Sequence, residues 1–269
     1  MPTFDQVKQA AWAGRADAYA ETFGRLCGRM VPALLDAAEV RAGDELLDAG
    51  TGPGAVAAAA ITRGARVTAV DPDEGMRRLA RLAAPRADVR EGALPDLDLA
   101  DASFDVVGAN FVLNLVGDPR AATRELVRVL RPGGRLAATV WPRPMSELHR
   151  LWEDVADAAG AERPASAAPL EPAMDFVRSP DGFAGLLEDA GLTDVHAERV
   201  GFVHRVDPES WWSGPARGVA TIGAVLLAQT PEVQGRMREQ FDRLSRPYLV
   251  DGMLHLPTAA VLAHGRRSQ

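Results

Sequence analysis

Cysteine and lysine are almost absent from this sequence, which contains one of each, Cys27 and Lys8, among 269 residues. A single cysteine excludes an intrachain disulfide and a cysteine-rich zinc site, and we predict no metal site. The single lysine, against an abundance of arginine, also removes most catalytic schemes that depend on a lysine amine. Any chemistry must therefore come from other side chains or from a bound cofactor.

Neither an excess of positive charge nor a long apolar run is present. The 30 basic and 37 acidic residues give a net charge of −7, which provides no general electrostatic case for nucleic acid or an anionic membrane as partner. The longest apolar run, Val219–Ala228, is far short of the ~20 residues of a membrane span, and no basic and then apolar leader opens the chain. We therefore expect a soluble cytoplasmic protein, and leave open whether it forms a homodimer.

The residues from Glu45 to Gly54 contain the most informative pattern in the chain. A short apolar run ends at Asp48, and glycines follow at positions 50, 52 and 54, directly before an alanine-rich run with strong helix propensity. This pattern predicts a strand, a tight turn and a helix. Glycines permit positive φ and a close ligand, and the helix N-terminus offers unpaired N–H groups. We expect a nucleotide-like ligand in the crevice beyond the strand's carboxyl end.

Strands and helices alternate from Glu45 to Trp141. The strand at Phe104–Asn110 is nearly continuous in small and apolar residues, as a strand buried on both faces should be. Repeated strand–helix units indicate a parallel sheet with helices on both faces. The further predicted strands are 66–71, 87–91 and 135–141, the helices are 74–83 and 119–130, and a turn is predicted at 131–134.

The alternation ends after Trp141. The patterns there predict helices at 146–159, 181–190 and within 208–246, and strands at 195–206 and 254–264. Two segments leave the carboxyl edge of the sheet, so we expect them to cover the ligand site. The predicted organisation is N-terminal helices that form a lid (1–40), a ligand-binding core (41–141), a first cap insertion (142–178), a core helix and strand (179–206), a helical cap insertion (207–252), and a final core strand and tail (253–269).

The glycine turn alone is compatible with more than one nucleotide. Gly50–Ala55 satisfies the G-x-G-x-x-G/A pattern of dinucleotide sites, and Asp71 ends the next strand, where an acid can accept hydrogen bonds from ribose hydroxyls. Asp48, however, stands where dinucleotide folds usually have an apolar residue. An NAD-dependent oxidoreductase would also need a proton relay, and two tyrosines and one lysine form no Tyr-x-x-x-Lys arrangement here.

Four motifs in sequence order carry a family resemblance. They are the glycine turn with its preceding acid, Glu91–Pro95 after the third strand, Ser103–Val107 at the fourth, and Arg128–Leu136 before the fifth. With this spacing, residues 40–141 resemble the class I S-adenosylmethionine-dependent methyltransferases. The resemblance implies an α/β fold, a Rossmann-like seven-stranded and mostly parallel sheet with helices on both faces, an antiparallel last strand and a helical cap. It also implies S-adenosylmethionine as cofactor and S-adenosylhomocysteine as product.

The resemblance further implies roles for individual residues. The glycine loop would pack against the methionine part of the cofactor, Asp48 would hold its amino group directly or through water, and Asp71 would bind the ribose. Asn110 and Phe111 fall where the reactive methyl should lie. The complete predicted cofactor-binding set is Tyr19, Asp48, Gly50, Thr51, Gly52, Gly54, Asp71, Pro72, Met76, Gly92, Ala93, Leu94, Asn110 and Phe111.

Methyl transfer from a sulfonium is an in-line displacement, in which much of the acceleration can come from positioning. A general base matters only when the acceptor arrives protonated. The catalytic candidates are His149, in the helix after the fifth strand, and Asn110. The Leu-His pair frequent in the resembled family is Leu113-Asn114 here, so no histidine base stands at that position.

Tryptophans mark the expected acceptor site. Trp141 closes the fifth predicted strand, and Trp211 and Trp212 begin the second insertion, where they could wall an apolar pocket. We therefore predict methylation of a small-molecule acceptor, on oxygen or nitrogen and in secondary metabolism. Two alternatives stay open: a non-methylating reaction that uses the same cofactor, and an NAD-dependent oxidoreductase.

Overall fold

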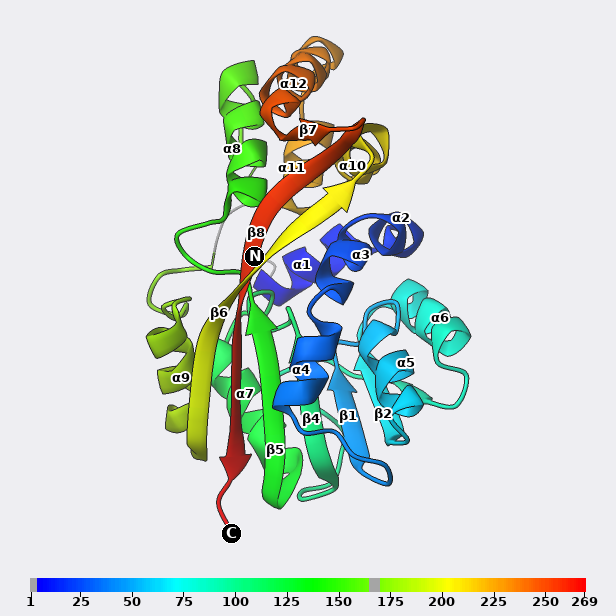
Figure 1. The fold of residues 1–269 in the computed structure, drawn as a ribbon, viewed down its shortest axis with the longest axis vertical. Helices are drawn as coiled ribbons and strands as arrows, with labels where there is room; N and C mark the ends of the chain where they lie inside the picture. The colour runs from blue at the N-terminus through cyan, green and yellow to red at the C-terminus, as the bar shows by residue number, and fades with distance from the viewer. Residues whose placement is uncertain (1–3, 165–169) are drawn as a thin grey trace.

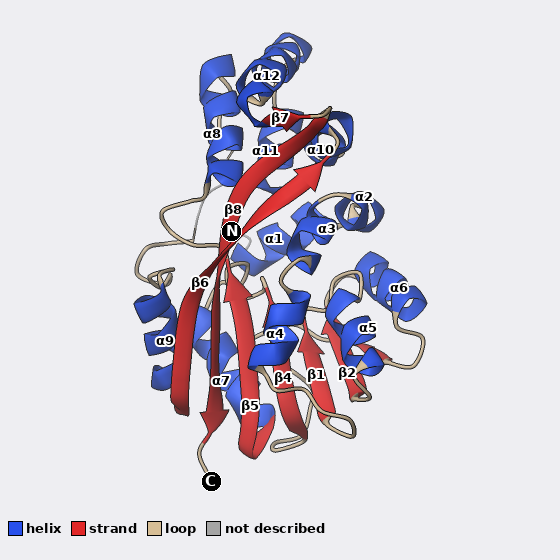
Figure 2. Cartoon of the chain, viewed as in Figure 1, coloured by secondary structure: helices blue, strands red, loops and turns tan. Residues whose placement is uncertain are grey.

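The computed structural model describes residues 4–164 and 170–269, and a mixed β-sheet runs through its whole length (Figures 1 and 2). Within the described residues the strand order is β3-β2-β1-β4-β5-β8-β6, and a short β7 pairs with β8. The strands are β1 (Glu45–Ala49), β2 (Arg66–Asp71), β3 (Asp88–Glu91), β4 (Phe104–Asn110), β5 (Leu130–Val140), β6 (Leu192–Val206), β7 (Leu249–Val250) and β8 (Met253–Arg267).

The long strand β8 is antiparallel to both of its neighbours, β5 and β6, whereas the pairs among β1 to β5 are parallel. The final strand is therefore inserted between the fifth and the sixth. This arrangement confirms the predicted fold class, a Rossmann-like sheet with an antiparallel last strand. Two predicted segments lie partly outside the described part of the chain: the N-terminal helices (1–40) at residues 1–3, and the first cap insertion (142–178) at residues 165–169.

Helices cover both faces of the sheet because successive strand residues point to opposite sides. Leu46 packs with α4 and α5 in one apolar core, while Leu47 packs with α7 and α9 in another. The helices are α1 (Phe4–Trp12), α2 (Ala16–Glu21), α3 (Phe23–Gly28), α4 (Val31–Ala37), α5 (Ala55–Thr62), α6 (Glu74–Ala83), α7 (Pro119–Val129), α8 (Glu147–Ala159), α9 (Pro180–Asp189), α10 (Pro208–Ala216), α11 (Ala220–Leu227) and α12 (Pro231–Leu244).

A third apolar core joins the two predicted cap segments, which are separated in sequence. The strands β6 and β8 extend beyond the rest of the sheet as a two-stranded arm, and α8, α10, α11 and α12 gather around it (Figure 1). Trp152 of α8 stacks on Phe241 of α12, with ring centroids 5.1 Å apart and planes 9° from parallel. The predicted strands 195–206 and 254–264 already reach the cap, and the structure lengthens them mainly at the opposite end, to Leu192 and Arg267.

The predicted turn at 131–134 is wrong as a separate element. β5 begins at Leu130, and the register with β4 moves from Phe104↔Leu130 to Val106↔Arg135, so the intervening residues form an irregularity inside the strand. Gly133 adopts φ +75° there, a left-handed conformation that suits glycine. The sequence correctly marked the position of the break but not its context.

Candidate active site

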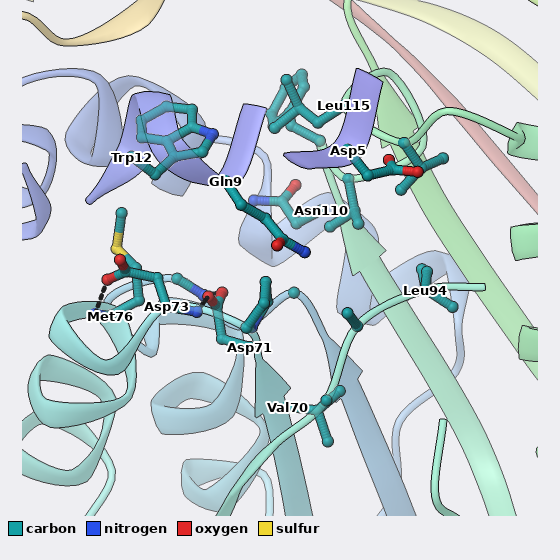
Figure 3. A pocket seen from close by; sticks show the side chains of 18 of the residues that line it. Asp5, Gln9, Trp12, Val70, Asp71, Asp73, Met76, Leu94, Asn110 and Leu115 are labelled. Atoms are coloured by element: carbon teal, nitrogen blue, oxygen red, sulfur yellow. Dashed lines mark hydrogen bonds between the residues drawn. The ribbon is translucent and has the colours of Figure 1, made fainter. Parts of the chain in front are cut away.

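A pocket opens at the carboxyl ends of β1, β2 and β4 (Figure 3). Between β1 and β4 the order of the strands changes direction, because the chain continues from β1 to β2 and β3 on one side and from β4 to β5 on the other. In open α/β sheets this is the place where ligands bind. Eleven of the fourteen predicted cofactor residues line it: Tyr19, Gly50, Gly52, Asp71, Pro72, Met76, Gly92, Ala93, Leu94, Asn110 and Phe111. Nine further residues were not predicted: Asp5, Gln9, Trp12, Val70, Asp73, Leu97, Val112, Leu115 and Val116.

The backbone of the glycine turn packs closely against the segment after β4 and against α6, and part of it also lines the pocket. Gly50 has φ +69°, and a Cβ there would lie 2.6 Å from Val112 Cγ2. Gly54 has φ +90°, and a Cβ there would lie 2.8 Å from Ala80 Cα of α6. Gly54 does not line the pocket, so its glycine is required by helix packing, whereas Gly50 lies at the pocket surface.

Asp71 both holds the glycine turn and faces the pocket. Its Oδ2 accepts a hydrogen bond of 2.9 Å from the Gly52 N–H, and its Oδ1 accepts one of 3.0 Å from the Asp73 N–H. Burial raises the pKa of the Asp71 carboxyl, and only 8% of the residue is exposed. A carboxylate has about four acceptor positions, so further acceptor capacity is left for hydroxyl groups of a ligand.

Asp48 lies directly beneath the turn and is fully buried. Its Oδ2 accepts hydrogen bonds from Thr51 Oγ1 at 2.6 Å and from the Ala57 N–H at 3.0 Å. Its Oδ1 is buried and has no partner among the described residues. Burial raises the pKa of Asp48 to about 7. Neither Asp48 nor Thr51 lines the pocket, so in this conformation they close the turn from below.

Asn110 is committed to the fold by both ends of its side chain. Its Oδ1 accepts a hydrogen bond of 2.7 Å from Thr139 Oγ1, and its Nδ2 donates one of 3.1 Å to the Cys27 carbonyl. These bonds tie β4 to β5 and to α3 next to the pocket wall. Asn110 thus has an anchoring role in this structure while it also lines the pocket, and its catalytic role stays a prediction.

Phe111 follows at the end of β4 in a strained backbone conformation. Its φ is +60°, which is unusual for a bulky residue and is characteristic of functional sites. Its N–H donates to the Thr139 side chain and carbonyl, each at 3.0 Å, and its ring stacks on Trp141 at 3.9 Å. Trp141 thus lies behind Phe111 and is not itself part of the pocket lining.

His149 does not reach the pocket either. Its Nδ1 lies 2.9 Å from Ser146 Oγ, and its ring packs 4.5 Å from the Trp141 ring. Burial lowers the pKa of His149 to about 4, so the imidazole is neutral at ordinary pH. His149 therefore packs on Trp141, which in turn stacks on Phe111 of the pocket lining, and His149 is not itself among the lining residues.

The predicted tryptophan wall belongs to the core of the cap. Trp211 is fully buried and packs 4.6 Å from the Phe23 ring and 5.9 Å from the Trp152 ring. Trp212 packs 5.3 Å from the Phe241 ring. Neither tryptophan lines the pocket. Their apolar surface is used to hold the cap helices together, which sequence pattern alone did not distinguish from an acceptor site.

Helix α1 lies across the pocket and contributes three of the residues that sequence reasoning missed (Figure 3). Asp5 Oδ1 accepts a hydrogen bond of 2.7 Å from the Gly117 N–H, which connects α1 to the segment after β4. Trp12 packs edge-on against Tyr19 with centroids 5.1 Å apart. No local pattern marks Asp5 or Gln9, because their role arises only when α1 folds back over distant strands.

The charge of the pocket is one-sided. Asp5, Asp71 and Asp73 are among the described residues that line it, and no arginine is among them. A positively charged group is favoured in such a place. The amino and sulfonium groups of S-adenosylmethionine fit this charge, its ribose hydroxyls fit Asp71, and the buried Asp48 Oδ1 provides a further acceptor near the turn. In the described part of the chain, no group of side chains is arranged to hold a metal ion.

Comparison with known proteins agrees with this geometry. Residues 47–138 match the family model of a methyltransferase domain. A malonyl-[acyl-carrier protein] O-methyltransferase of Enterobacter lignolyticus is 31% identical over 179 residues, which cover 66% of this chain and 71% of the relative. A demethylmenaquinone methyltransferase of Paenarthrobacter aurescens is 34% identical over 117 residues, covering 44% and 46%.

A solved structure of a phosphoethanolamine N-methyltransferase from Haemonchus contortus, with phosphomonomethylethanolamine and S-adenosylhomocysteine, has a TM-score of 0.60 and 15% identity. The superposition covers 100% of this chain and 61% of that one. At this identity the likeness concerns the fold. No described helix has the length and apolar character needed to cross a bilayer.

Proposed function

This chain belongs to the class I S-adenosylmethionine-dependent methyltransferases, and from that premise we propose that it methylates a small-molecule acceptor in the pocket beneath α1. One observation carries the proposal. The fold brings Gly50, Asp71, Leu94 and Phe111, from four separate strand ends, into a single pocket. S-adenosylmethionine has the parts to contact all four: ribose hydroxyls for Asp71, an adenine for the apolar lining, and a sulfonium methyl that would lie near the end of β4.

In this assignment Asp71 accepts hydrogen bonds from the ribose hydroxyls, and its two bonds from backbone N–H groups hold it in position. Met76 and Leu94 would contact the adenine, and the unpartnered Asp48 Oδ1 would accept a hydrogen bond from the amino group. When bound, S-adenosylmethionine supplies an electrophilic methyl group on its sulfonium. The contribution of this chain is then to position both partners and to exclude water.

The lining residues also favour a class of acceptor. Val112, Leu115 and Val116 provide an apolar wall after β4, and Asp5 of α1 is bonded to Gly117, the residue that follows this wall. With three aspartates and no arginine among the described lining residues, an acceptor with its own anionic group is disfavoured there. We therefore infer an acceptor that is neutral or cationic and partly apolar, methylated on oxygen or nitrogen.

Three of the predicted chain segments acquire roles in this proposal. The N-terminal segment, through α1, is the lid over the cofactor, and the helices of both insertions form a cap beside it on the β6–β8 arm. His149, Trp211 and Trp212 act only by supporting this frame, since none of them lines the pocket.

Methyl transfer is tested with cofactor that is labelled in the methyl group, using a panel of neutral hydroxylated and aminated aromatic compounds beside their carboxylated counterparts. Label in a neutral acceptor supports the proposal, and preference for the carboxylated series would contradict the charge argument. Product formed without label would show that the cofactor serves another reaction. The Asp71→Ala variant is the control, because its loss of transfer must accompany loss of cofactor binding.

A further inference from the structure

A second hollow lies on the far side of α2 and α3, and it shares no lining residue with the cofactor pocket. It is a groove between these helices and the end of β6, which is the edge strand of the sheet. Arg25 and Arg29 enter it from α3 and the residue that caps it, and Arg205 enters it from β6. Residues separated by more than 170 positions therefore converge on one place.

The positive charge in this groove is only partly offset by the protein, since Asp207 is the one lining acid without an arginine partner among the described residues. Among the described residues, no ion pair or side-chain hydrogen bond joins Arg25, Arg29 or Arg205 to an acid, although most arginines of the chain have such a partner. The two acids in the groove are already engaged: Glu21 pairs with Arg217, and Asp207 accepts a hydrogen bond of 2.8 Å from the Ser210 N–H.

A buried imidazole adds an independent indication of a ligand. His204 lines the groove, only 5% of it is exposed, and its Nε2 has no hydrogen-bond partner in the described part of the chain. Arg29 lies near enough to act electrostatically on this ring, so a cation lies close to an imidazole whose Nε2 is unsatisfied. A buried polar atom without a partner is uncommon in proteins and indicates a missing one.

The position of Arg25 and Arg29 near the end of α3 could by itself reflect the helix dipole, which favours cations there. That explanation does not extend to Arg205, which comes from a strand, or to the unpartnered ring of His204. Convergent guanidinium groups repel one another and are matched by an oxyanion, to which they donate paired hydrogen bonds.

We propose that this groove binds a small organic phosphate monoester that carries an apolar substituent. Its three terminal oxygens suit several donors at once, and two negative charges suit three guanidinium groups. The apolar part of the ligand lies against Val203 and Met253, which are 43% and 38% exposed at the rim of the groove. The site is separate from the methyl-transfer pocket, because α2 and α3 stand between them.

Isothermal titration of the full chain with hexyl phosphate tests this assignment. We expect saturable binding with one site, and at least about fivefold weaker binding in Arg29→Gln and in Arg205→Gln, since each loses a charged donor in a partly screened setting. Arg199→Gln is the matched control: Arg199 is exposed on the same strand and lies outside the groove. The affinity for S-adenosylhomocysteine, measured in parallel, should be the same in all variants.

Three outcomes would overturn the proposal. One is the absence of hexyl phosphate binding, and another is equal weakening in the Arg199→Gln control. The third is binding to vesicles that contain phosphatidic acid, lost in Arg205→Gln, without binding of soluble hexyl phosphate, which would assign the groove to a membrane surface. Inorganic phosphate should bind at least about fivefold more weakly than hexyl phosphate; equal affinities would refute the role of the apolar rim.

Discussion

Replacing Asp48 by asparagine should make the ligand-free protein more stable at alkaline pH while weakening the cofactor site. In the folded chain, burial raises the pKa of Asp48 from its ordinary value of 3.8 to about 7. The folded state therefore keeps a proton that the unfolded state has already released. A raised carboxyl pKa leaves full stability only below the unfolded pKa, and stability is lost as pH rises through the folded pKa.

The magnitude follows from this difference. Between pH 5 and pH 7 the unfolded carboxyl is ionised and the folded one is not, so the wild-type chain loses about 1.4 kcal/mol of stability per pH unit from this group. An asparagine does not ionise, and its oxygen can still accept from Thr51 and Ala57. The advantage of Asp48→Asn over wild type should thus grow by about 2–3 kcal/mol between pH 5 and pH 8.5.

Urea unfolding of the ligand-free proteins at pH 5 and pH 8.5 measures this change directly. Asp189→Asn, which removes an exposed carboxylate at the end of α9, is the control and should show no such growth. At pH 8.5, where the wild-type carboxyl is ionised, Asp48→Asn should bind S-adenosylhomocysteine about 10- to 100-fold more weakly, because the ligand amino group loses a charged acceptor. An advantage of equal size at both pH values would refute the reasoning.

Three more changes separate the pocket from its support. Gly50→Ala should lower S-adenosylhomocysteine affinity by about tenfold or more, because its Cβ would meet Val112. Gly43→Ala is the control: Gly43 also has a positive φ, +90°, but its Cβ would meet no atom, so this variant has only the conformational cost of a positive φ and should leave binding intact. Trp211→Ala should cost about 3–5 kcal/mol in thermal or urea unfolding without changing that affinity. His149→Gln should leave the shape of the rate–pH profile unchanged between about pH 6 and 9, since the ring is neutral there; a lost limb would restore it as a base.

The sequence was most informative where chemistry is concentrated in short segments. Gly50 and Gly52, with Asp71 one strand later, predict a turn and an acceptor whose positions depend mainly on parallel strands ending at one edge. These features are local in sequence, and the regular geometry of a parallel sheet brings them together at one edge. The antiparallel insertion of β8 could be expected only through the family resemblance, because no residue of Met253–Arg267 indicates which strands it joins.

Side chains in the cap and lid were harder to assign. An exposed tryptophan in an acceptor pocket and a buried one in a helical core have the same pattern in sequence, so Trp211 was placed in the wrong surroundings. His149 lies on the predicted helix, but Trp141 and Phe111 separate it from the pocket. This separation arises from contacts among the ends of β4 and β5 and helix α8, which are distant in sequence and could not be predicted. Asp5 could not be predicted, since its partner Gly117 lies more than 100 residues away.

The central claim is that the pocket formed by Asp71 and the glycine turn binds S-adenosylmethionine. Isothermal titration of wild type and Asp71→Ala with S-adenosylhomocysteine, and separately with NAD, tests it most directly. We predict that wild type binds S-adenosylhomocysteine and not NAD, and that Asp71→Ala loses about 1–3 kcal/mol of that binding because the ribose loses its charged acceptor. Unchanged affinity in Asp71→Ala, or binding of NAD in place of S-adenosylhomocysteine, would contradict the account.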